Sequence, residues 1–214
     1  MATEVELEKA AAAAAAACLV EAGMTVGLGT GSTVAYLLPA IAARALDIRC
    51  VATSHATEAD ARRLGLDVRP FEGIDRLDLA IDGADQVAPD NWLIKGGGGA
   101  HTREKVVAAA AERFVVIVSS DKVVERLSPP VPLELMAFGA DSILRSLPDA
   151  KLRPSTPRTP DGGLVADWLG EFDDPAALSA LLAGTPGVAG HGLFPPELVD
   201  DVFIGQKNGV ERRM

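Results

Sequence analysis

A run of four glycines, flanked by a lysine and a glutamate, is the stretch of this sequence best suited to chemistry. Lys95 precedes the glycines at 96–99, and Glu104 enters the first turn of a helix expected from Thr102 to Ala111. Glycines cost a fold more backbone entropy than other residues, so such a run is typical of backbone that must touch something. Backbone N–H groups at the start of a helix favour the binding of an anion. A fixed cation, a nest of donors and a carboxylate able to act as a base therefore predict catalysis rather than simple binding.

A second glycine-rich turn, Gly27 to Thr33, follows an apolar segment and opens a helix-like one, which is the setting of a phosphate-binding loop. Ser32 stands where a dinucleotide fingerprint has its third small residue, and no lysine precedes it as in a Walker loop, so a nucleotide-dependent enzyme is disfavoured. The alternative is a tight turn in which Ser32 or Thr33 caps the helix. Hydroxyl residues at 53–57, after the next expected strand, would face the same crevice.

Two carboxylates three residues apart follow the apolar strand that ends at Ile81, in the sequence Asp82-Gly83-Ala84-Asp85. At the carboxyl end of a parallel strand, both can turn toward a ligand, and a sugar hydroxyl is a natural partner. Binding of Mg²⁺, or a turn capped by Asp85, are the alternatives.

Lysine is used sparingly, and two of the six lysines, Lys95 and Lys122, fall at the ends of expected core strands. A compact ammonium suits the neutralisation of one oxygen during a reaction, although an ordinary solvated lysine is the alternative for Lys122. Glu104 has an alternative too, as a first-turn acid favoured by the helix dipole. The histidines lack metal-ligand spacing, so we expect no metal and only minor polar roles for them: His55, His101 and His191.

The composition excludes several classes of protein and partner. A net charge of −10 and a pI near 4.8 argue against nucleic acid as a partner. The acidic N-terminal residues are unlike a signal peptide, and no apolar run approaches a membrane span, so no membrane partner is expected. Two isolated cysteines, Cys18 and Cys50, form neither a disulfide framework nor a metal site, and we expect both to be buried thiols in a reducing cytoplasm.

Alternating strands and helices predict an α/β fold, with a Rossmann-like parallel sheet covered by helices and a second, smaller α+β domain after a proline-rich boundary at 129–132. We assign residues 1–127 and 203–214 to the first domain and 128–202 to the second, with 153–163 as a mobile loop. Helices are expected at 7–22, 34–46, 57–64, 102–111, 138–147 and 175–182. Strands are expected at 24–28, 48–52, 67–69, 77–81, 114–118, 131–136, 164–168, 187–189 and 199–204, the last returning to the first sheet.

Together, the motifs at 27–33, 53–57, 82–85 and 95–105 resemble ribose-5-phosphate isomerase, type A, in order and spacing. The resemblance runs through nearly the whole chain and departs from the family at Ser119–Asp121 and Thr159–Gly163. It implies reversible isomerisation of D-ribose 5-phosphate and D-ribulose 5-phosphate through an enediolate, in the pentose phosphate pathway, without cofactor, by a homodimer or homotetramer.

The resemblance also implies roles by position. Glu104 matches the general base; Asp82 and Asp85 match the pair that holds sugar hydroxyls, one of them assisting ring opening; Lys95 and Lys122 match groups that offset oxyanion charge. The implied substrate-binding residues are Thr30, Gly31, Ser32, Thr33, Asp82, Gly83, Ala84, Asp85, Lys95, Gly96, Gly97, Gly98 and Lys122. The alternative function is a non-catalytic sugar-phosphate sensor or assembly module on the same fold, which would need the phosphate loops but not Glu104.

Overall fold

The computed structural model describes residues 2–214, whose contacts divide the chain into two compact units. The first consists of the residues up to Ala84, Arg103–Val123 and Glu197–Met214, and the second of Asp85–Thr102 and Val124–Pro196. The predicted domains differ from these units chiefly in residues 85–102, which group with the second unit. There β5 (Gln86–Val87), β6 (Leu93–Ile94) and β12 (Leu193–Phe194) pair in one antiparallel sheet.

The first unit is built on a seven-stranded sheet, in the order β14-β13-β7-β4-β1-β2-β3. All neighbours are parallel except β13 and β14, which confirms the predicted α/β class and the return of the chain to this sheet. The central β7 is a continuous run of buried, mostly β-branched residues, as expected of a strand covered on both faces. The strands are β1 (Thr25–Leu28), β2 (Arg49–Ala52), β3 (Asp67–Val68), β4 (Leu79–Asp82), β7 (Phe114–Ser119), β13 (Asp201–Gln206) and β14 (Gly209–Arg213).

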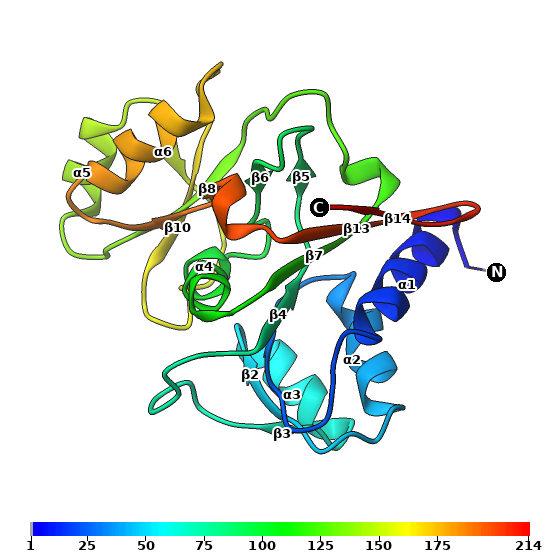
Figure 1. Ribbon diagram of the computed structural model, residues 1–214. Helices are drawn as coiled ribbons and strands as arrows, with labels where there is room; N and C mark the ends of the chain where they lie inside the picture. Colours follow the sequence, from blue (N-terminus) through cyan, green and yellow to red (C-terminus); the bar gives the residue numbers. More distant parts are fainter. Residues whose placement is uncertain (1) are drawn as a thin grey trace. The chain divides into compact units, whose positions relative to one another are not determined.

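Helices cover both faces of this sheet (Figure 1). In β1, Val26 and Leu28 belong to a core cluster with the alanines of α1 and the leucines of α2, whereas Gly27 between them faces Val107 of α4. Because successive strand residues point to opposite faces, α4 lies on the other side from α1 and α2. The helices are α1 (Glu4–Ala17), α2 (Val34–Ala42), α3 (His55–Arg63) and α4 (His101–Ala110), with short 3₁₀ turns η1 (Ser120–Lys122) and η2 (Pro196–Leu198).

Helix α1 is shorter than predicted. A capping box at Thr3 starts it, but it ends at Ala17 instead of continuing to residue 22. The guanidinium of Arg44, from the segment after α2, donates to the carbonyls of Ala17 and Val20, so carbonyls at the helix end are satisfied by a side chain from a distant part of the chain. The expectation that Cys18 is buried was therefore wrong: it caps the helix end and is exposed, whereas Cys50 in β2 is buried as predicted.

The second unit holds an antiparallel sheet in the order β11-β8-β10-β9, which confirms the smaller α+β part of the fold. Helices α5 and α6 lie beside this sheet (Figure 1). Ile143 of α5, Leu147 directly after it, and Leu178 and Leu182 of α6 belong to one core cluster with residues of the strands. The elements are β8 (Val131–Leu135), α5 (Ala140–Ser146), β9 (Ala150–Leu152), β10 (Leu164–Trp168), α6 (Pro175–Gly184) and β11 (Val188–His191).

Candidate active site

A cluster of hydroxyl groups joins the loops that follow β1 and β2. The Thr30 hydroxyl lies 2.8 Å from the hydroxyls of Thr53 and Ser54 and 3.2 Å from that of Thr57. Thr57 donates in turn to the carbonyl of Gly29 at 2.9 Å. The carboxyl ends of β1 and β2 therefore carry one connected polar network, as the sequence predicted for two neighbouring parallel strands.

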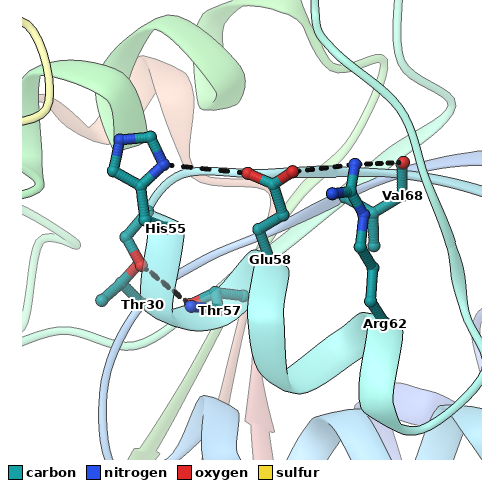
Figure 2. A network of polar contacts seen from close by, with 7 residues as sticks. Thr30, His55, Thr57, Glu58, Arg62 and Val68 are labelled. Atoms are coloured by element: carbon teal, nitrogen blue, oxygen red, sulfur yellow. Dashed lines mark hydrogen bonds and ion pairs between the residues drawn. The ribbon is translucent and has the colours of Figure 1, made fainter.

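The outer face of α3 carries a second, solvent-facing network. Figure 2 shows Glu58 between His55 and Arg62, with Thr57 and Thr30 on the inner side. Glu58 lies 3.8 Å from His55 and 2.8 Å from Arg62. Exposed pairs of this kind contribute little to stability. His55 thus lies on the exposed face of α3, and its minor polar role stays a prediction.

Asp82 ends β4 and is buried beside the loop after β1. Its Oδ1 accepts hydrogen bonds from the Thr30 N–H at 3.0 Å and the Gly83 N–H at 2.7 Å, so backbone donors stabilise the charged carboxylate and fix its direction. A Cβ on Gly29 would lie 1.9 Å from the Asp82 carboxyl carbon. Position 29 must therefore be glycine for this carboxylate to occupy its place.

The rest of the loop after β1 presents Gly31, Ser32 and Thr33. Gly31 has a φ of +141°, with open space where a Cβ would project. Thr33 occupies the N-cap of α2 but makes no side-chain cap hydrogen bond, and the Ser32 hydroxyl accepts from the Lys9 ammonium at 2.9 Å instead. Neither hydroxyl therefore makes the hydrogen bond to a backbone N–H of α2 that the alternative, a helix cap, would require. Lys9, which sequence reasoning missed, adds a cation to this loop from α1.

Helix α4 brings Glu104 to the same edge of the sheet. Ala111, directly after the helix, pairs with Leu77 near the start of β4, so the helix runs from the carboxyl ends of the strands to their amino ends. A Cβ on Gly27 would come within 2.5 Å of Val107, so this turn of α4 lies against the middle of β1. Glu104 lies on the same helix face, about 4.5 Å nearer the carboxyl end. It is only 4% exposed.

Lys122 lies in η1, directly after β7, and is half-buried. Its ammonium lies 3.4 Å from Oδ2 of Asp121, and the other carboxylate oxygen, Oδ1, accepts a hydrogen bond from the Ser119 hydroxyl. Although desolvation opposes it, the Ser119 hydrogen bond together with the Lys122 charge holds the pKa of Asp121 below its usual range. Residues 119–121 thus supply Lys122 with an ionised neighbour.

In the second unit, one loop gathers Asp85 and the glycine run. The Asp85 N–H donates to the carbonyl of Ile94 at 2.8 Å, and its Oδ2 accepts from the Gly97 N–H at 2.7 Å. The Gly99 N–H donates to the carbonyl of Gly96 at 2.9 Å. The glycine run is therefore an ordered loop in which two of the four backbone N–H groups, those of Gly97 and Gly99, already donate hydrogen bonds within the chain.

Lys95 is the most deeply buried lysine at this site, with 2% of its surface exposed. Its N–H donates to the carbonyl of Gly192 at 2.8 Å, and its ammonium lies 5.4 Å from the centre of the Phe194 ring, within cation–π range. Backbone and side chain are thus both held by the segment around β12. Gly97 has a further partner that sequence reasoning missed: Arg153 donates to its carbonyl at 2.7 Å.

The predicted site residues thus fall into two groups. The first unit brings together the loop at 30–33, the hydroxyls at 53–57, Asp82 and Glu104, all at the carboxyl edge of one sheet, with Lys122 following β7. The second unit holds Asp85, Lys95 and the glycines in one loop, since the division falls between Ala84 and Asp85. Nowhere in residues 2–214 do three or more His, Cys, Asp or Glu side chains gather so as to hold a metal ion. None of the helices formed by these residues could span a bilayer.

Comparison with known proteins gives independent evidence of the family to which the chain belongs. Residues 49–209 match the family model of ribose 5-phosphate isomerase A (phosphoriboisomerase A). The chain is 44% identical to ribose-5-phosphate isomerase A of Caulobacter vibrioides over 209 residues, 91% of this chain and 92% of the relative. Among solved structures, ribose 5-phosphate isomerase A of Methanocaldococcus jannaschii matches with a TM-score of 0.91 and 32% identity over 96% of this chain and 97% of that one. A D-ribose-5-phosphate isomerase in complex with phospho-erythronic acid matches with a TM-score of 0.92 and 33% identity over 99% of each chain. The chain belongs to the ribose 5-phosphate isomerase A family.

Proposed function

We propose that the protein interconverts D-ribose 5-phosphate and D-ribulose 5-phosphate by moving a proton between C2 and C1 of the open-chain sugar, with Glu104 as the base. The observation that carries this proposal is the burial of Glu104 at the carboxyl edge of the sheet, in a chain of this family. A carboxylate with little access to water can take a proton from carbon and keep it for return.

The reaction balances without a redox partner. Glu104 removes the C2 proton of the open-chain aldose, and the electron pair forms a C1–C2 double bond, which leaves an enediolate with negative charge on O1. Glu104 then returns the proton to C1, the O2 proton moves to O1, and C2 becomes the ketone of the product. The barrier falls if positive groups and N–H donors face the oxygens that become charged.

Lys95 and Lys122 are the cations that we assign to this charge. Lys95 is held at both its backbone and its side chain, so little reorganisation is needed when charge develops. A buried ammonium also interacts more strongly with an oxyanion than an exposed one, because water screens it less. The loop at 30–33, with Lys9 bonded to Ser32, is suited to the phosphate group of the substrate.

The two aspartates differ in burial, and we divide their roles accordingly. Asp82 is buried, with Oδ1 held by two backbone N–H groups, so we assign it to ring opening, where a fixed carboxylate must exchange a proton with a ring hydroxyl. Asp85 is exposed and uses Oδ2 to hold Gly97. Its other oxygen is suited to a sugar hydroxyl.

The alternative, a non-catalytic sensor or assembly module, is not favoured. A sensor does not need a carboxylate at this position to recognise a sugar phosphate, whereas proton transfer between two carbon atoms needs a base there, and buried ionisable groups of this kind are typical of functional sites. We also infer a homodimer or homotetramer in the cytoplasm. On the second unit Phe138 is 88% exposed and Met136 lies exposed two residues before it, as expected of an apolar contact surface. Light scattering that finds only monomer would contradict the assembly.

The test of the function is conversion of ribose 5-phosphate followed by proton NMR in D₂O, with and without EDTA. We expect turnover in both, with partial incorporation of deuterium into the product, because the buried Glu104 carboxylate returns some protons directly whereas others exchange with solvent before their return. Phospho-erythronic acid, the ligand in the related structure, should inhibit competitively, since its carboxylate mimics a planar, charged enediolate. Absence of conversion refutes the proposal, and loss of turnover in EDTA that Mg²⁺ restores would reassign the aspartates as metal ligands.

A further inference from the structure

The side chain of Arg153 ties the glycine-rich loop to the sheet of the second unit. Arg153 follows β9, and its N–H donates to the carbonyl of Val165 in β10 at 2.9 Å, so its backbone is part of the sheet edge. Its guanidinium is 22% exposed and reaches the carbonyl of Gly97 through Nη1 at 2.7 Å. The first residue of the segment predicted to be a mobile loop therefore holds a segment that carries the proposed chemistry.

Asp167 fixes the direction of this guanidinium. It lies in β10, is 17% exposed, and accepts both Nε, at 2.9 Å, and Nη2 of Arg153. A bidentate pair of this kind sets the plane of the guanidinium and leaves Nη1 pointing in one direction. In this structure that direction is the Gly97 carbonyl.

The orientation of one peptide group follows from this contact. In a trans peptide the C=O of one residue and the N–H of the next point in opposite directions, so the hydrogen bond from Arg153 to the Gly97 carbonyl aims the Gly98 N–H the other way. The N–H of Gly97 is held as well, by Asp85 at 2.7 Å. Both peptide groups that flank the Gly97 Cα are thus fixed, at a residue type whose backbone would otherwise rotate readily.

Gly96 and Gly98 are the two amides of this run for which no hydrogen-bond acceptor is found in the described part of the chain, residues 2–214, and of these two only the Gly98 N–H belongs to the peptide group that Arg153 holds. Nothing lies within 4 Å of the position that a Cβ on Gly98 would occupy. We propose that Arg153 and Asp167 are positioning residues that hold the Gly98 N–H as a preorganised donor to the oxyanion of the isomerisation. This inference rests on the proposed function. A donor of this kind is effective only if its direction is fixed before charge develops.

The test compares R153Q, R153K and D167N with R158Q. Arg158 is the matched control, because it lies in the same loop and also donates to a backbone carbonyl, that of Gly162, without touching Gly97. Loss of an oxyanion donor costs about 10²–10³ in kcat, and loss of a tether should cost less, so we expect kcat for ribose 5-phosphate to fall about 10- to 100-fold in R153Q with KM within about threefold. R153K should lose as much as R153Q, because a point charge cannot bond Asp167 twice and Gly97 once.

The double variant R153Q/D167N separates positioning from folding. It removes both charges, so no carboxylate is left without its partner, and its kcat should equal that of R153Q if Asp167 acts only through Arg153. Variants with the wild-type kcat, or with a raised KM and an unchanged kcat, would overturn the inference; the latter would make Arg153 a substrate-binding cation. In each of these results the wild type and R158Q still convert ribose 5-phosphate, whereas a wild type without turnover refutes the proposed function itself.

Discussion

Replacement of Glu104 by glutamine is the most direct test of the chemistry. Glutamine fills the same space in the buried site, so it leaves no cavity and keeps one carbonyl oxygen for hydrogen bonding, but it cannot accept a proton from carbon. A general base contributes about 10²–10⁴ to a rate. Because Glu104 is only 4% exposed, water has little access to act as a substitute base, and we expect the loss to reach at least about 10²-fold, or about 2.7 kcal/mol in the barrier.

The assay is steady-state conversion of ribose 5-phosphate by wild type, E104Q, E104D and E112Q. Glu112 is a suitable control because it loses the same charge just after α4, at an exposed ion pair with Arg76. E104D retains a carboxylate but withdraws it by about one C–C bond, 1.5 Å, and a displacement of that size should also cost about 10²-fold. KM should change little in E104Q, since the base acts on the reacting carbon rather than on binding. Near-normal turnover by E104Q would falsify the assignment and move the search to Asp82.

Three further outcomes are expected. G29A should fold but lose most of its activity, because the added Cβ would lie 1.9 Å from the Asp82 carboxyl carbon and displace that carboxylate; wild-type kcat would show that Asp82 needs no fixed position. G98A should keep the wild-type Tm, because its Cβ enters open space, and should lower kcat/KM for ribose 5-phosphate; an unchanged kcat/KM would remove Gly98 from the site. Thiol alkylation of the native protein at neutral pH should label Cys18 and spare Cys50, because burial raises the pKa of the Cys50 thiol to about 12; equal labelling of both would contradict the packing of β2.

The sequence was sufficient to predict those strands and helices whose apolar residues recur with a regular spacing. The apolar strands of the first sheet and the helices between them repeat clearly enough to predict an α/β fold, and polar residues directly after strands predict where its ligands bind. Two-residue strands such as β5 and β6 carry no period, which is why residues 85–102 could not be placed with the second unit. The early end of α1 was not predicted either; carbonyls there accept hydrogen bonds from Arg44, a residue that is distant in sequence and that a local pattern does not reveal.

Side chains that act across long sequence separations were missed for the same reason. Arg153 lies 56 positions from the carbonyl that it holds, and Lys9 lies 23 positions from Ser32. Each belongs to a segment whose local pattern is ordinary: Arg153 lies in a loop after a short strand, and Lys9 lies near the start of an alanine-rich helix. Motif reasoning finds residues whose neighbours in sequence share their function. It does not find residues that reach a site through the fold.

The glycine run shows how a structure refines such a motif. The sequence suggested a nest of equivalent donors, but the structure separates the members by their local requirements. Gly96 and Gly99 have positive φ angles of +103° and +77°, which favour glycine, and a Cβ on Gly97 would lie 3.0 Å from the Asp85 carboxylate, which would have to shift to make room for it. Gly98 has neither a positive φ nor a neighbour within 4 Å of a would-be Cβ. Because the fold does not require glycine there, we expect the close approach of a substrate to be the reason for it, and the N–H of Gly98, which belongs to the peptide group that Arg153 holds, is the donor that we expect to act in catalysis.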